Sequence, residues 1–161
     1  MVCVISRKTR LVPRAYPYYP SFDGGGVKPI TTKLVELCQK RYKAKNLGTY
    51  VVRPMRGRSD LSVHATGYAA DLGADLKTLQ QMWDFFVTNS LALKVAEVHF
   101  YKAPGTTHGL GYRCSRGEGQ KGVKRWSSTD NGGSGGLWLH IELEEQDPAH
   151  FEAEFRRLKP A

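Results

Sequence analysis

The chain has 161 residues, of which 40% are hydrophobic and 24% are charged. This composition is typical of one globular domain and excludes a disordered chain. No uninterrupted apolar run approaches the ~18 residues that a membrane-spanning helix needs. The formal net charge of +9 favours an acidic partner.

The basic residues are spread over four segments and do not form one helical stripe; the segments are Arg7–Arg14, Lys40–Lys45, Arg53–Arg58 and Arg113–Arg125. Two polyanions suit such a surface: nucleic acid, and the bacterial cell wall with its carboxylates and phosphodiesters. No nucleic-acid motif accompanies the charges, so nucleic acid is the less favoured partner. A generally cationic surface with diffuse attraction to polyanions is the alternative.

Residues 1–30 are predicted to form an arm separate from the domain of residues 31–161. Four prolines interrupt any helix here, tyrosines lie between them, and Gly24–Gly26 form a predicted joint. The arm either wraps its own domain or docks on a neighbour. An apolar patch (Val2–Ile5) precedes the basic cluster, the wrong order for a secretory signal. Three cysteines without C-x-x-C spacing predict neither a zinc knuckle nor a disulfide framework; they are Cys3, Cys38 and Cys114.

The first half of the domain alternates predicted helices and strands. Apolar residues from Leu34 to Tyr42 recur at helical spacing, with Thr31 or Thr32 as N-cap and Gly48 just past the end. A β-branched strand is predicted at 49–53, a loop at 56–61 and a second strand at 68–72. Asp75 is expected to cap a helix that runs to about Asn89 with an apolar, aromatic inner face.

The second half continues with a strand at 93–101 and a long loop over 103–136, rich in glycine and polar residues. A loop of this size is usually functional. The last strand is predicted at 137–143, and Asp147-Pro148 opens a final helix. These elements predict an α+β domain with helices packed on one side of a small antiparallel sheet.

Two segments carry candidate metal ligands. The segment SVHATGYAAD, residues 62–71, places His64 and Asp71 seven positions apart, separated by small residues and Gly67. The run WLHIEL, residues 138–143, supplies His140. Two histidines and one aspartate form a complete protein ligand set for a catalytic zinc, leaving the fourth position for water. If the strands that carry Asp71 and His140 are neighbours, the three side chains meet.

The first segment resembles the S-x-H-x-x-G-x-A-x-D signature of the D-alanyl-D-alanine metallopeptidase family, with five matching positions: Ser62, His64, Gly67, Ala69 and Asp71. This family includes zinc D,D-carboxypeptidases and phage endolysin peptidases, and its distant fold relative is the amino-terminal domain of Hedgehog proteins. The resemblance covers roughly Thr32 to Leu158 and implies that His140 is the third zinc ligand. It also implies a Hedgehog/DD-peptidase-like form of the α+β fold.

The resemblance assigns roles to two further residues. Ser62 would hold the substrate near the metal. Arg53 matches the family's arginine that binds the substrate or stabilises the developing oxyanion, for which a planar, permanently charged guanidinium is suited. An ordinary surface arginine is the alternative for Arg53.

The chain departs from the family at the general base, where Leu137 replaces an acidic residue three positions before the last histidine. Loss of such a group typically costs ~10²–10⁴-fold in rate. Three substitutes are conceivable: Glu142, on the same strand face as His140; Asp130, in the loop 127–136; and His99, on the preceding strand. Glu142 has a second interpretation, a partner that orients a ligand histidine.

The leading hypothesis is therefore a zinc-dependent peptidase that cleaves peptidoglycan stem peptides, as a carboxypeptidase or an endopeptidase. Because the sequence predicts no secretory signal, the hypothesis is a phage-encoded protein, carried on the virion tail or released to the cell wall. Residues 1–30 would then contact other tail proteins. The alternative is a catalytically impaired wall-binding or structural tail protein of the same fold, which Leu137 favours. A nucleic-acid-binding protein is the third hypothesis.

Overall fold

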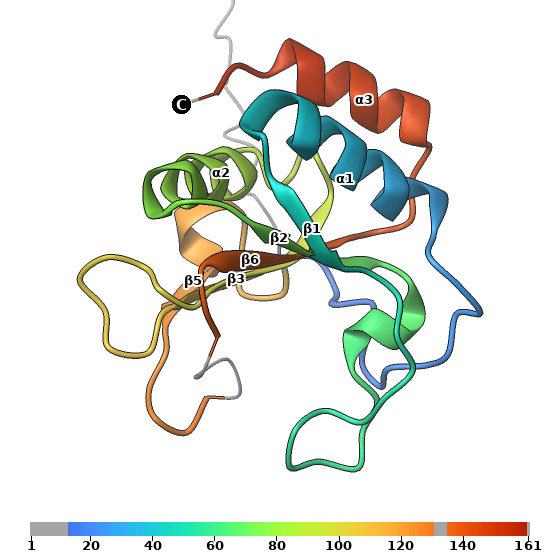
Figure 1. The fold of residues 1–161 in the computed structure, drawn as a ribbon, viewed down its shortest axis with the longest axis vertical. Helices are drawn as coiled ribbons and strands as arrows, with labels where there is room; N and C mark the ends of the chain where they lie inside the picture. Colours follow the sequence, from blue (N-terminus) through green and yellow to red (C-terminus); the bar gives the residue numbers. More distant parts are fainter. Residues whose placement is uncertain (1–12, 131–134, 161) are drawn as a thin grey trace, which may run out of the picture.

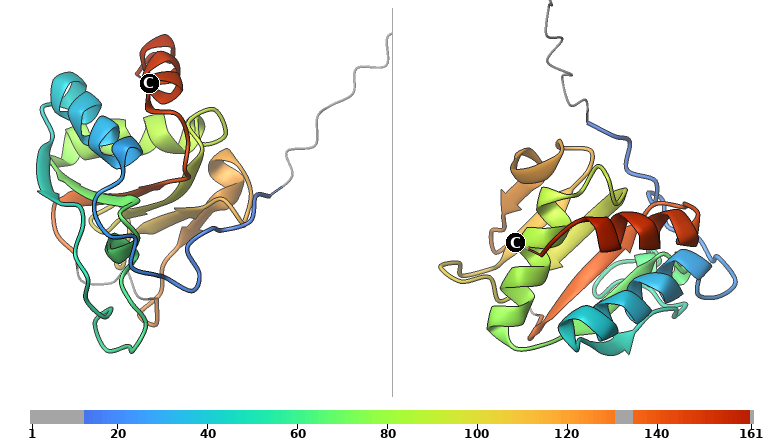
Figure 2. Two further views of the ribbon diagram at one scale, coloured as in Figure 1. Left: turned by 90° about the vertical axis from the view of Figure 1, so that its right-hand side faces the viewer. Right: turned by 90° about the horizontal axis from the view of Figure 1, so that it is seen from above.

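The computed structural model describes residues 13–130 and 135–160. Within them, a six-stranded antiparallel sheet forms the centre and three helices cover one of its faces, as Figures 1 and 2 show. The strands lie in the order β1-β2-β6-β3-β4-β5. Their bounds are β1 Lys45–Gly48, β2 Ala69–Gly73, β3 Val95–Phe100, β4 Leu110–Arg113, β5 Val123–Arg125 and β6 Trp138–Leu143. The helices are α1 Pro29–Tyr42, α2 Leu76–Thr88 and α3 Pro148–Arg157, and two short 3₁₀ helices are η1 Val63–Thr66 and η2 Gly119–Gly122. The predicted α+β architecture is confirmed.

The core lies between the sheet and the helices because the strands alternate. In β6, Leu139, Ile141 and Leu143 are fully buried in the core, and the residues between them point to the other face. The aromatic face of α2 packs into the same core, as predicted. The face of the sheet without helices therefore carries polar residues, and it is bordered by the loops drawn below the sheet in Figure 1.

The helix ends follow from capping chemistry. Asp75 and Asp147 accept hydrogen bonds from backbone N–H groups in the first turns of α2 and α3, as their positions predict. The predicted cap at Thr31 or Thr32 is wrong, because α1 already begins at Pro29, and proline is favoured at the first helical position. Helix α1 ends at Tyr42, where Lys43 takes the left-handed conformation.

Two predictions about strands are wrong. Residues 49–53 form no strand; the edge strand β1 comes earlier, at Lys45–Gly48, and the chain then leaves the sheet. The reason lies in the tertiary structure, because the Thr49 carbonyl accepts a hydrogen bond from a histidine ring instead of a strand partner. The predicted loop 103–136 also contains β4, η2 and β5. Strands of four and three residues among glycines leave too short a pattern to recognise.

The described part of the arm wraps its own domain. Tyr18 is buried and its hydroxyl donates to the Leu143 carbonyl, while Arg14 forms an ion pair with Glu144 at 2.7 Å. Gly24 is not a free joint, because its N–H donates to the Ala65 carbonyl at 2.8 Å.

Several sequence predictions fall outside the described residues. Residues 1–12 of the arm, with Cys3, and residues 131–134 of the loop 127–136 are among them. Within the described ranges, none of the helices has the length and apolar character needed to cross a bilayer.

The turn after η1 gives the first prediction. Gly67 has φ +83°, and a Cβ there would lie 2.1 Å from the Gly26 carbonyl oxygen. A side chain costs ~1–2 kcal/mol in this backbone conformation, and the clash adds to that cost. We expect Gly67→Ala to lower the free energy of unfolding by more than about 2 kcal/mol in denaturant titrations. Gly57→Ala is the control, since Gly57 has φ +72° with nothing within 4 Å. An equal decrease in the free energy of unfolding in Gly67→Ala and Gly57→Ala would show that the close contact with Gly26 is unimportant.

Candidate metal centre

Strand register brings the metal-binding candidates together. Asp71 in β2 lies opposite His140 in β6, and His140 lies opposite His99 in β3. All three side chains project from the face of the sheet that the helices leave uncovered, as the alternation of the strands requires. Asp71, His99 and His140 thereby form one row across three strands, although His99 and His140 lie 28 and 69 positions after Asp71 in the sequence.

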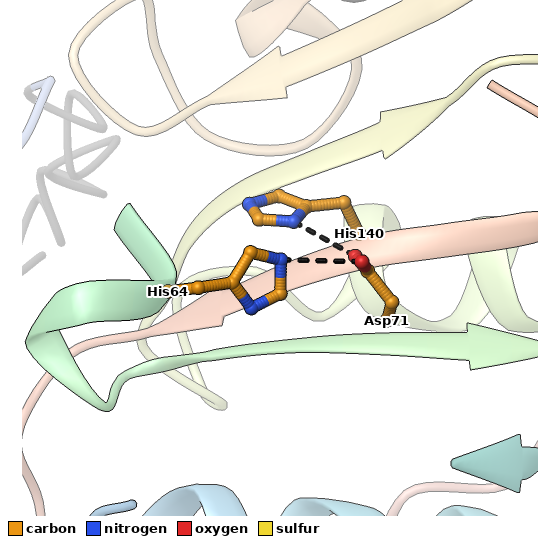
Figure 3. A group of neighbouring side chains, drawn as sticks. All are labelled: His64, Asp71 and His140. Atoms are coloured by element: carbon orange, nitrogen blue, oxygen red, sulfur yellow. Dashed lines mark hydrogen bonds and ion pairs between the residues drawn. The ribbon is translucent and has the colours of Figure 1, made fainter. Parts of the chain in front are cut away.

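His64 reaches this row from η1. Ser62 is the N-cap of η1, and its hydroxyl accepts the His64 N–H at 3.3 Å. Gly67 ends η1 in the left-handed conformation, which turns the chain directly into β2. Figure 3 shows the His64 ring, carried by this turn, and the His140 ring both pointing at the Asp71 carboxylate. The small residues of the sequence motif are therefore the residues that allow this tight turn.

The donor atoms lie close enough together to share one metal ion. His64 Nε2 lies 3.2 Å from one Asp71 oxygen, and His140 Nδ1 lies 3.0 Å from the other. The three ligand atoms lie within 4.8 Å of one another. Ligands at 2.0–2.1 Å from a tetrahedral zinc lie about 3.3 Å apart. His64, Asp71 and His140 can thus hold a metal ion if their donor atoms draw closer together.

Each histidine is held by its other ring nitrogen. His64 Nδ1 donates to the Thr49 carbonyl at 2.6 Å, and His140 Nε2 lies 2.8 Å from Glu142 Oε1. With a metal bound, such contacts would fix the tautomer, so that Nε2 of His64 and Nδ1 of His140 would each offer a lone pair to the ion. This arrangement of a neutral imidazole backed by a carbonyl or a carboxylate is typical of metal ligands.

The electrostatics of the site suit a cation. Burial alone would raise the pKa of Asp71, but hydrogen bonds from His140 and His64 outweigh it and hold that pKa well below its usual value. Burial alone would lower the pKa of His140, but the hydrogen bonds and charges of Asp71 and Glu142 raise it to about 10. In the metal-free protein a proton on His140 therefore supplies the positive charge that a metal ion would supply.

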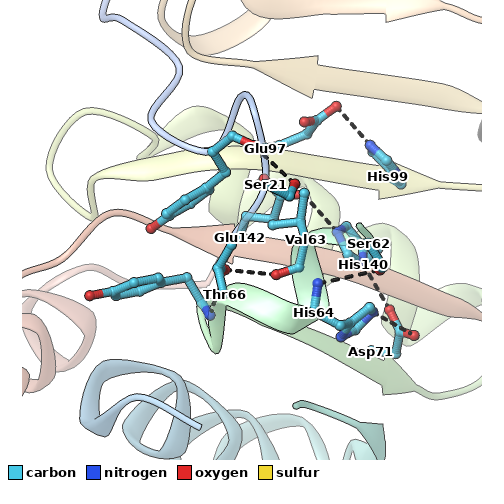
Figure 4. A network of polar contacts seen from close by, with 12 residues as sticks. Ser21, Ser62, Val63, His64, Thr66, Asp71, Glu97, His99, His140 and Glu142 are labelled. Atoms are coloured by element: carbon cyan, nitrogen blue, oxygen red, sulfur yellow. Dashed lines mark hydrogen bonds and ion pairs between the residues drawn. The ribbon is translucent and has the colours of Figure 1, made fainter. Parts of the chain in front are cut away.

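A second histidine–glutamate pair lies beside the first. His99 Nε2 is 2.7 Å from Glu97 Oε1, and the His99 and His140 rings have centroids 4.8 Å apart. Arg113 bonds the other Glu97 oxygen at 2.8 Å. Burial alone would raise the pKa of Glu97, but His99 and Arg113 lower it to about 2. Figure 4 shows the two pairs side by side on the sheet.

The residues assigned to substrate binding lie on the approach to η1. Arg53 is exposed, and its carbonyl accepts the Ser62 N–H at 2.9 Å. The loop between them is closed by a bridge between Pro54 and Leu61. Ser62 has a structural task, the capping of η1, beside any contact with a substrate.

Two candidates for the general base, Glu142 and Asp130, already have hydrogen-bond partners in the structure. Both Glu142 oxygens are engaged, one by His140 and one by the Tyr16 hydroxyl at 2.7 Å, and the residue is 1% exposed. Asp130 accepts a hydrogen bond from the Ser127 N–H at 2.6 Å, which closes a turn in its own loop, and a second one from Lys124 in β5. Leu137, at the position where the resemblance predicts an acid, is 52% exposed. The geometry supports Glu142 as the partner that orients His140.

Sequence reasoning named Glu142 as a possible partner of His140 but missed three other groups that support the site: Glu97, the Thr49 carbonyl and the Tyr16 hydroxyl. The Glu97–His99 spacing repeats the His140–Glu142 spacing on an antiparallel strand, and that repetition is a signal in the sequence. The Thr49 carbonyl and the Tyr16 hydroxyl give no such signal, because only tertiary contacts bring them to the site.

Comparison with models of protein families, with curated proteins and with solved structures gives no match. The resemblance of residues 62–71 to the metallopeptidase signature therefore remains a prediction from the sequence.

The pKa of His140 predicts how the stability of the metal-free protein depends on pH. The folded-state pKa of about 10 exceeds the ordinary value of 6.5, so protonation of His140 stabilises the folded protein. This contribution to the free energy of unfolding is complete below about pH 6.5. It is lost as the pH rises through 10. We expect the free energy of unfolding to fall between pH 7 and pH 10 in denaturant titrations with a chelator present. The zinc-loaded protein should show a smaller fall, since the metal replaces the proton. A flat profile for the metal-free protein would contradict this account.

Proposed function

We propose that this protein is a zinc-dependent peptidase. The observation that carries the proposal is the convergence of His64, Asp71 and His140, with both histidines oriented by a second contact. Bound zinc would supply a water of pKa ~7 and polarise the carbonyl of a scissile bond.

The chain's own residues would bind, orient and exchange protons around that ion. His64, Asp71 and His140 would hold it, and Ser62 and Arg53 would position the substrate. His99 is the best-placed group for proton transfer, because Glu97 fixes its Nε2 and its side chain remains 21% exposed. Its Nδ1 lies 3.4 Å from the Tyr101 hydroxyl, a long contact that leaves it able to bind another partner.

The proposed substrate is the stem peptide of bacterial peptidoglycan, cleaved as a carboxypeptidase or an endopeptidase. Two features support it: the match of residues 62–71 to the D-alanyl-D-alanine metallopeptidase signature, and the net charge of +9, which favours an anionic wall polymer. The antiparallel sheet with helices on one face is consistent with the Hedgehog/DD-peptidase fold that we propose. A phage-encoded protein, acting from the virion tail or after release to the wall, is the proposed context.

Zinc binding and turnover test the proposal directly. The protein should bind about one zinc per chain, measured by elemental analysis after dialysis, and release D-alanine or new amino groups from purified peptidoglycan. His64→Ala and His140→Ala should lose both properties, because each removes a metal ligand. His150→Ala is the matched control, since His150 is exposed on α3. Full zinc content in His140→Ala would overturn the metal site.

Substitution of the three candidate bases distinguishes a residue that orients a metal ligand from a residue that transfers a proton during hydrolysis. We expect Glu142→Gln to weaken zinc binding by ~10–100-fold, because it disturbs the partner of a ligand histidine. His99→Ala should keep its zinc and lose turnover by ~10²–10⁴-fold. Asp130→Asn should change neither quantity. Zinc affinity from chelator competition and initial rates of hydrolysis distinguish these outcomes. Normal turnover in His99→Ala would remove His99 from the mechanism.

The second candidate function is a wall-binding or structural protein with the same fold. Two observations favour it: Leu137 occupies the position of the family's acid, and both Glu142 oxygens are already engaged. Full zinc content with no hydrolysis, and peptidoglycan binding in pull-down assays that His99→Ala leaves unchanged, would establish this function instead.

A further inference from the structure

The N-terminal arm contacts the candidate metal centre at two places. At the first, the Tyr16 hydroxyl donates to Glu142 Oε2 at 2.7 Å, and Glu142 Oε1 holds His140. At the second, Gly24 donates to the Ala65 carbonyl at 2.8 Å, and Lys28 donates to the Gly67 carbonyl at 3.1 Å. The arm thus supports both the strand that carries His140 and the turn that carries His64.

Tyr16 occupies the point where two buried carboxylates face each other. Glu97 and Glu142 are paired in the strand register and are only 5% and 1% exposed. Arg113 neutralises Glu97, and its guanidinium also lies over the Tyr16 ring, 4.1 Å from the centroid. The Tyr16 hydroxyl provides Glu142 with the hydrogen bond that water would otherwise provide. Without that hydroxyl, one oxygen of a buried carboxylate would lose its described partner.

The contacts form one continuous chain from the arm to the metal ligands. It runs from Tyr16 through Glu142 to His140, and from His140 through Asp71 to His64. Each link in this chain is a polar contact of 3.2 Å or less. A change at Tyr16 therefore alters how strongly Glu142 accepts from His140, and with it the orientation and basicity of a metal ligand.

The arm is fixed in this place by contacts that lie away from the site. Arg14 bonds Glu118, Glu144 and the carbonyl of Val95, and Tyr18 stacks on Tyr68 with centroids 5.1 Å apart. Tyr16 lies two residues from each of these anchors, so its ring is placed by the arm as a whole.

We infer that Tyr16 is a positioning residue of the metal centre, and that docking of the arm on the sheet sets the affinity of that centre for zinc. The inference rests on the metal site of the proposed function. By reciprocity, zinc binding also tightens the docking of the arm. A partner or variant that displaced the arm would release the metal without touching a ligand.

The test is zinc affinity in full-length variants, measured by competition with a chromogenic chelator. We expect Tyr16→Phe to bind zinc about 3- to 10-fold more weakly, which corresponds to the loss of one hydrogen bond. Tyr19→Phe is the matched control and should bind as the native protein does, because Tyr19 is 75% exposed on the same arm. Equal affinities in Tyr16→Phe and Tyr19→Phe would overturn the inference while the metal site stands. Absence of zinc binding in the native protein would overturn the proposed function itself.

A double-mutant cycle distinguishes action through Glu142 from a general loss of packing. In the Glu142→Ala background, Tyr16→Phe should have no further effect on zinc affinity, because its acceptor is gone. If Glu142→Ala does not fold, Glu142→Gln serves in its place, and the effect of Tyr16→Phe should shrink. The absorption spectrum of the cobalt-substituted protein should also change in Tyr16→Phe and remain native in Tyr19→Phe. Additive effects on affinity, or an unchanged cobalt spectrum, would refute the positioning role.

Discussion

The candidate site depends on one constraint, the register of β2, β6 and β3. Asp71, His140 and His99 face one another across these strands only because the antiparallel pairing holds this alignment. A shift by one residue would move every one of these side chains into the core and bring apolar residues to the open face. The alternation that buries Leu139, Ile141 and Leu143 therefore also fixes the positions of the ligands. Core packing and site geometry are two consequences of one pattern.

Around this row, polar groups support one another in successive layers. His64 and His140 contact Asp71, Thr49 and Glu142 contact the histidines, and Tyr16 contacts Glu142. Asp71, His140 and Glu142 each gain polar partners in this way, which is the condition under which buried charges are tolerated in a protein interior. The outermost layer is the N-terminal arm, so the segment most remote in sequence contributes to the orientation of a ligand in the penultimate element of the chain.

The two histidine–glutamate pairs show how similar local patterns acquire different tasks. In both β3 and β6 a histidine and a glutamate are two residues apart, so each histidine lies on the same face as its own carboxylate. His140 also contacts Asp71 and faces His64, which makes it a candidate metal ligand. His99 lies one strand further from His64, beside Trp126 and Tyr101, at 4.7 Å and 5.9 Å between ring centroids. Because His99 lies beside the candidate ligands and outside the group of three, we propose it for proton transfer.

The sequence alone determined the α+β class, the three helices and the strands that carry Asp71, His99 and His140, because each has a clear period or cap. It also predicted the convergence of His64, Asp71 and His140, since His64 and Asp71 lie within ten residues whose small side chains permit one tight turn and His140 lies in a predicted strand. It failed for residues 49–53, where the Thr49 carbonyl bonds a histidine ring instead of a strand partner, and for residues 103–136, where short strands leave too weak a pattern. Only the tertiary structure decided which carboxylate orients a histidine and where the arm lies. Those outcomes depend on the Thr49 carbonyl and the Tyr16 hydroxyl, groups whose partners are distant in sequence and leave no local signal.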